Sequence, residues 1–199
     1  MAVSFEYDFE STFAAITYLA AQQIPELTKY KLCKLLFLAD KFHLVRFGRP
    51  ITGDNYCALP YGPIPSQTLN VLTASITGDG FGSTAERAKR LGEAIELDFQ
   101  YENPRFRTKG AFDRDHLSDS DIFALNKVIA QYGEMDFERL KAITHEMFAY
   151  KNAWDERPAG SKRAEMPFES FFEEDADAAA GARELMIEDD LIRSASAAR

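Results

Sequence analysis

The sequence predicts an α+β fold that is mainly α: a compact domain of about five helices, a small β-hairpin or sheet, and a C-terminal acidic segment. Five stretches carry apolar residues at the spacing of an amphipathic helix. Another stretch alternates apolar and polar residues, as a half-buried strand does. The composition, 46% hydrophobic and 28% charged over 199 residues, fits one globular domain with an extension.

The first predicted helix extends from Phe9 to Gln22. Asp8 or Ser11 has the polar side chain that caps a helix start, and Pro25 interrupts the chain before the next element. The apolar residues that define this helix recur at nearly helical spacing and are Phe9, Phe13, Ile16 and Ala20.

The second predicted helix is the longest. It starts after Thr28, a favourable N-cap, and reaches about Phe47; Gly48 takes the C-cap position, with Pro50 just beyond. One stripe is expected to face the core, formed by Leu32, Leu35, Leu36, Ala39, Phe42 and Val45.

The same helix is predicted to have a basic face. Between Glu26 and Arg49 there are six basic and two acidic residues, and the lysines are expected mostly off the apolar stripe. This face would pair with the acidic C-terminal segment, with an acidic partner or with nucleic acid, and we favour the first. The lysines concerned are Lys29, Lys31, Lys34 and Lys41.

The centre of the chain is rich in turns. The segment 51–59 reads as turns followed by an extended stretch, and residues 61–66 form a rigid Gly-Pro turn into a third helix, 66–77. A glycine-rich loop follows at 78–82, and residues 86–92 are predicted as a short helical turn or a loop.

A hairpin and two helices complete the domain. Residues 95–101 form the alternating strand, and 106–112 are expected to return as its partner after a turn at Asn103-Pro104. The fourth helix opens with the capping-box spacing of Ser118 and Asp121 and ends at Gly133, and the fifth covers 136–147.

Negative charge is concentrated near the C-terminus. The formal net charge is -9, and the residues from Asp155 onward hold 12 acidic and 6 basic side chains. We therefore predict a domain over residues 9–155 and a partly helical acidic extension over 156–199. A pI near 4.9 disfavours broad binding to nucleic acid.

Other sequence features concern the cellular location and the binding of metals or cofactors. No apolar run approaches the roughly 20 residues that span a bilayer, and the acidic N-terminus does not resemble a signal peptide. We expect a cytoplasmic protein with no membrane association. Cys33 and Cys57 are too few for a disulfide scaffold, and His43, His116 and His145 lack metal-ligand spacing, so no metal or cofactor is expected.

No catalytic motif stands out, and we do not expect an enzyme. The alternative enzymatic hypothesis uses His145 with Glu146, or Cys57 with His43 or His145, as a nucleophile–base arrangement.

The candidate binding residues each have a structural alternative. Tyr61, Gly62 and Pro63 form either a rigid presented turn or a purely architectural one. Trp154 is either a binding anchor or an aromatic that closes the core. Asp40 is expected to bind Lys or Arg within the domain.

Three ordered blocks, 31–40, 48–53 and 56–65, resemble the Panacea domain of SocA-like and phage-associated antitoxins. The resemblance covers about residues 10–155. Later matching positions are Leu117-Ser118, Tyr132-Gly133, Leu140, Thr144-His145-Glu146 and Trp154.

The resemblance implies an antitoxin that neutralises a cognate toxin by direct protein–protein binding. In the SocA-like branch it implies an adaptor that delivers the toxin to a cytosolic AAA+ protease, and a DNA-binding regulator is a further alternative. A homo-oligomer is compatible with the sequence. The partner-binding residues are predicted as Tyr61, Gly62, Pro63, Lys34, Arg49 and Trp154; motif residues with a structural role are predicted as Leu35, Leu36, Asp40, Gly48, His145 and Glu146.

Overall fold

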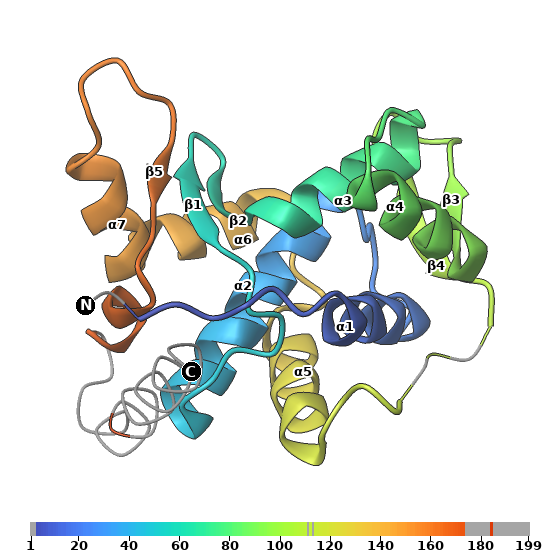
Figure 1. The fold of residues 1–199 in the computed structure, drawn as a ribbon, viewed down its shortest axis with the longest axis horizontal. Helices are drawn as coiled ribbons and strands as arrows, with labels where there is room; N and C mark the ends of the chain where they lie inside the picture. Colours follow the sequence, from blue (N-terminus) through green and yellow to red (C-terminus); the bar gives the residue numbers. More distant parts are fainter. Residues whose placement is uncertain (1–2, 111, 113, 174–183, 185–199) are drawn as a thin grey trace, which may run out of the picture.

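The computed structural model describes residues 3–110, 112, 114–173 and 184 (Figure 1). Within that part of the chain lie seven α-helices, five short strands and one 3-10 helix. In chain order they are α1 (Phe9–Ala21), α2 (Lys29–Phe47), β1 (Tyr56–Leu59), β2 (Gly62–Pro65), α3 (Ser66–Thr77), α4 (Ser83–Ala94), β3 (Ile95–Asp98), β4 (Arg105–Thr108), α5 (Asp119–Tyr132), α6 (Phe137–Glu146), α7 (Phe148–Asp155), β5 (Ala164–Glu165) and η1 (Phe168–Phe172).

The predicted fold class, mainly α with small antiparallel sheets, is confirmed. The five predicted helices correspond to α1, α2, α3, α5 and α6. Two further helices appear, α4 where a short turn or loop was predicted, and α7 after α6. Helix α4 buries only Ala88 and Leu91, so few apolar residues mark it as a helix in the sequence. Met147, with extended backbone, separates α6 from α7.

Helix α2 lies at the centre of the molecule and packs against α5, the β1–β2 hairpin, α6 and η1 (Figure 1). Its predicted caps are confirmed: the Thr28 side chain accepts from the Lys31 backbone, and Gly48 adopts the left-handed conformation at φ 77°. Because neighbours surround α2, Lys31 and Lys34 are buried, at 1% and 0% exposure. The prediction that they belong to a basic surface face is therefore wrong.

Two small sheets flank the helices. β1 pairs with β2 on one edge and with β5 on the other. The prediction of a turn over residues 61–66 is wrong for most of this range, because residues 62–65 form β2 and pair with residues 56–59. The predicted hairpin is confirmed as β3–β4, with Ile95 opposite Thr108, although both strands are shorter than expected.

Residues beyond α7 return to the domain. β5 extends the β1–β2 sheet, and η1 places three phenylalanines in the core. The Phe171 ring centroid lies 5.4 Å from that of Phe37 and 5.8 Å from that of Tyr56. The domain boundary at 155/156 stays a prediction, and most of the predicted acidic extension lies outside the described residues.

Candidate partner-binding surface

The β1–β2 hairpin ends in a tight turn formed by Pro60 and Tyr61, between the paired residues Leu59 and Gly62. Gly62 has a backbone φ angle of 99°, which residues other than glycine rarely adopt. A Cβ atom there would lie 2.8 Å from Lys34 Nζ and 3.1 Å from His145 Cδ2. Glycine at this position thus permits α2 and α6 to approach the turn closely.

Lys34 of α2 holds the β1–β2 hairpin through a hydrogen bond. Its Nζ donates a 2.8 Å hydrogen bond to the Pro63 carbonyl oxygen, and the side chain is fully buried. Burial lowers the pKa of Lys34 to about 7. The amine is therefore a structural donor that holds the hairpin turn, and it does not lie on the surface.

His145 begins a row of aromatic rings beside the hairpin. Its ring stacks on Tyr150 at a centroid distance of 4.4 Å, and Tyr150 stacks on Trp154 at 5.9 Å. The Tyr150 hydroxyl donates to the Leu59 carbonyl, and Arg157 lies 3.9 Å from the Trp154 ring centroid. The row therefore braces β1 against α7.

The electrostatics of this row favour a neutral imidazole. Burial and then the positive charges of Lys34 and Lys141 lower the pKa of His145. A hydrogen bond with the Tyr61 backbone opposes this shift. The His145 Nε2 is buried, with no hydrogen-bond partner among the described residues.

Tyr61 itself points outward and is 59% exposed. It lines a hollow of about 450 Å³ together with residues from α2, α6 and the β3–β4 hairpin. We define the hairpin-tip surface as Tyr30, Tyr61, Tyr101 and Phe137 around this hollow, with Lys141 beside it.

Each ring of the hairpin-tip surface is held by a neighbour. The ring centroids of Tyr30 and Phe137 lie 6.1 Å apart, and Lys141 Nζ lies 5.5 Å from the Tyr61 ring centroid. Arg105 lies over the Tyr101 ring and pairs with Glu26 at 3.0 Å. Tyrosine, phenylalanine and arginine are enriched in protein–protein interfaces, which makes this a candidate partner-binding surface.

Arg49 belongs to a separate network at the opposite end of α2. Its guanidinium pairs with Asp121 at 2.9 Å, and its carbonyl oxygen lies 2.7 Å from His43 Nδ1. His43 Nε2 lies 2.9 Å from Ser120 Oγ and 3.1 Å from Asp121 Oδ1. These contacts tie the end of α2 to the capped start of α5, and a partner-binding role for Arg49 stays a prediction.

Asp40 is buried in a ring of donors. Its carboxylate accepts from the Ile51 backbone at 2.8 Å, from the Thr52 backbone and hydroxyl, and from the Tyr56 hydroxyl at 2.9 Å. Burial raises the pKa of Asp40 to about 6. The expected Lys or Arg partner is wrong, since the described partners of Asp40 are backbone and hydroxyl groups that fix the 51–55 loop and the start of β1 to α2.

The residues of the enzymatic alternative make separate contacts. Cys57 Sγ lies 3.3 Å from Ser66 Oγ and 3.1 Å from Arg163 Nε. Glu146 is exposed and pairs with Lys151 at 2.6 Å, whereas His145 lies against Gly62 and Tyr150. Leu35 and Leu36 are core residues, and their role as family-motif positions stays a prediction.

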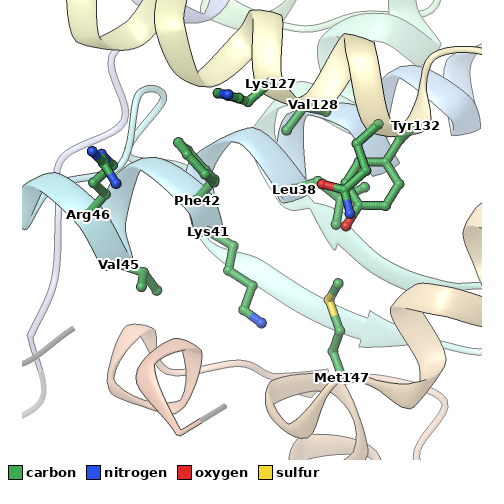
Figure 2. Close-up of a pocket in the computed structure, with 10 residues that line it drawn as sticks. Leu38, Lys41, Phe42, Val45, Arg46, Lys127, Val128, Tyr132 and Met147 are labelled. Atoms are coloured by element: carbon green, nitrogen blue, oxygen red, sulfur yellow. The ribbon is translucent and has the colours of Figure 1, made fainter. Parts of the chain in front are cut away.

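A second hollow, of about 300 Å³, lies between α2 and α5 (Figure 2). It has an apolar floor and basic side chains at its margin, and we call it the basic groove. Its main lining residues are Leu38, Phe42, Val45, Val128 and Met147, with Lys41, Arg46 and Lys127 as the cations.

The structure thus gathers most of the predicted binding residues at one place. Lys34, Gly62 and Pro63 meet under the turn that presents Tyr61, and Trp154 completes the adjacent row. Sequence reasoning missed Tyr30, Tyr101 and Phe137, which come from three different elements. Their convergence around the hollow beside Tyr61 is a tertiary property that periodicity does not report.

Two properties of the described residues bear on other classes of function. None of the described helices combines the length and apolar character needed to cross a bilayer. Among the same residues, no group of three or more His, Cys, Asp or Glu side chains is arranged to hold a metal ion.

Fold and surface together define a small, mainly helical domain that presents an aromatic hairpin tip. Residues 32–154 match the family model described as Antitoxin SocA-like, Panacea domain, and the chain belongs to this family. The predicted resemblance is thereby confirmed over most of its length. Comparisons with curated proteins and with solved structures gave no significant match.

Proposed function

We propose that this chain is the antitoxin of a toxin–antitoxin pair and neutralises its toxin in the cytoplasm by direct protein–protein binding. The family match carries the proposal, because the family is one of antitoxin-like domains. The hairpin-tip surface supports it, since exposed tyrosines on a rigid turn supply contact area at a low cost in conformational entropy.

Within this proposal the predicted binding residues have two roles. Tyr61 contacts the toxin, while Lys34, Gly62 and Pro63 hold the turn in its presented geometry. The row ending in Trp154 braces the same hairpin from the side of α7.

The proposal is tested by co-expressing the chain with the product of its neighbouring gene. Tyr61→Ala should weaken the complex at least about tenfold and reduce rescue of growth, because truncating an interface hot spot removes more than about 1.4 kcal/mol. The matched control is Phe81→Ala, an aromatic that is 90% exposed in the α3–α4 loop and should leave binding unchanged. Full rescue and unchanged affinity in Tyr61→Ala would contradict a toxin interface at the hairpin tip.

The same assay separates direct inhibition from delivery to a protease. Direct binding predicts rescue in cells that lack the AAA+ protease, whereas an adaptor requires that protease. Two of the four lysines predicted on the basic face, Lys31 and Lys34, are buried, which leaves less surface charge for the DNA-binding alternative.

A further inference from the structure

The basic groove has the character of a binding site for an acidic, apolar segment. Lys41, Arg46 and Lys127 line it, and none of its described lining residues is acidic. Arg46 and Lys127 approach the Phe123 ring from α2 and α5, at 5.7 Å and 5.4 Å from its centroid. Positive charge from two helices is thus concentrated at one margin of an apolar floor.

The chain leaves the described core close to this groove. Phe171 packs against Phe37, and Lys41 follows Phe37 by about one helical turn on the same side of α2. η1 and α2 lie side by side in Figure 1. Glu173, directly after η1, is the last residue before the acidic segment 174–199.

The remaining segment is long enough and has the complementary composition. Twenty-six residues follow Glu173, and an extended chain spans about 3.3 Å per residue, whereas the 19 residues of α2 rise only about 28 Å. Residues 174–199 hold seven acidic and three basic side chains. Their apolar residues are clustered near acidic ones and include Leu185, Met186, Ile187, Leu191 and Ile192.

We propose that residues 174–199 bind in the basic groove of the same chain as an intramolecular ligand. Carboxylates of the segment meet Arg46, Lys127 and Lys41, and its apolar side chains cover Phe42, Val45 and Met147. Tethering raises the effective concentration of the segment to the millimolar range, so weak contacts suffice to keep the groove occupied. This proposal is independent of toxin binding at the hairpin tip.

Photo-crosslinking of the full chain tests the proposal. The photoreactive residue p-benzoylphenylalanine is placed at Phe42, and crosslinked peptides are identified by mass spectrometry. The expected product joins position 42 to residues 174–199 within one chain. The same probe at Phe81, on the exposed α3–α4 loop, should give no such product. A crosslink from position 42 to a second copy, or to none of residues 174–199, overturns the proposal.

A charge variant separates specific docking from mere proximity. Arg46→Glu/Lys127→Glu should lose the crosslink from position 42, while Lys89→Glu/Lys162→Glu, with the same change in net charge at exposed positions elsewhere, should retain it. Circular dichroism and the Tm of each variant verify folding. An unchanged crosslink yield in the groove variant would overturn the electrostatic basis of the docking.

Discussion

At the scale of single residues, Lys34 shows how burial changes the role of a charged side chain. Its neighbours are the Pro63 carbonyl, the Gly62 backbone and the His145 ring. Desolvation disfavours the ammonium form, whereas the hydrogen bond to Pro63 needs only an N–H group. The residue therefore holds the hairpin turn in either protonation state, at different stability.

The lowered pKa of Lys34 should make the free energy of unfolding depend on pH. Between pH 7 and about 10 the folded chain has released the Lys34 proton, while the unfolded chain still holds it. The unfolded state then binds more protons, so Lys34 makes stability rise with pH by at most about 1.4 kcal/mol per unit. Below pH 7 both states hold the proton, and the burial penalty is fully present.

The measurement compares urea unfolding of the native chain and of Lys34→Met at pH 6, 7.5 and 9. The native chain should gain stability relative to the variant as the pH rises. The control, Lys89→Met, changes an exposed lysine and should follow the native profile. Parallel profiles for the native chain and Lys34→Met would show that Lys34 titrates at an ordinary pKa.

At the scale of elements, the hairpin turn depends on one glycine. Gly62→Ala places a methyl group against Lys34 Nζ in a left-handed backbone, which should cost about 2–4 kcal/mol. In contrast, Gly92 lies in α4 with open space around it, so Gly92→Ala should be neutral or stabilising by up to about 1 kcal/mol. Chemical denaturation measures both, and equal effects of the two substitutions would argue against the close approach.

The elements also show what can be read from sequence. The caps Thr28, Gly48 and Ser118 were predictable, because capping depends on local residue type and spacing. Burial of Lys31 and Lys34 was not, because an apolar stripe implies one covered face, whereas α2 is covered on several sides. Likewise, the donors around Asp40 come from a loop and the start of β1, 11 to 16 residues away in sequence.

At the scale of the whole molecule, the core includes residues that lie beyond α7. Phe168, Phe171 and Phe172 are at most 4% exposed, and β5 completes the three-stranded sheet. The negative charge after residue 155 led to the prediction of an extension from residue 156. It hid the contribution of these phenylalanines to the core, because acidic residues surround them in the sequence.

Two truncations should therefore behave differently. A chain ending at Asp155 loses these phenylalanines and should be destabilised by more than about 5 kcal/mol, since burial of each is worth roughly 1.5–3 kcal/mol. A chain ending at Glu173 keeps them and should unfold with nearly native Tm. Thermal unfolding followed by circular dichroism compares the two, and similar Tm values would show that η1 contributes little to the core.

The late position of η1 also matters during synthesis. Translation delivers α2 early, but Phe171, which covers Phe37 and Tyr56, emerges only after most of the chain has been made. A nascent or prematurely terminated chain lacks the ring that packs on Phe37 and Tyr56. Quality control in the cell should thus discriminate sharply between complete copies of this protein and copies that stop before Phe171.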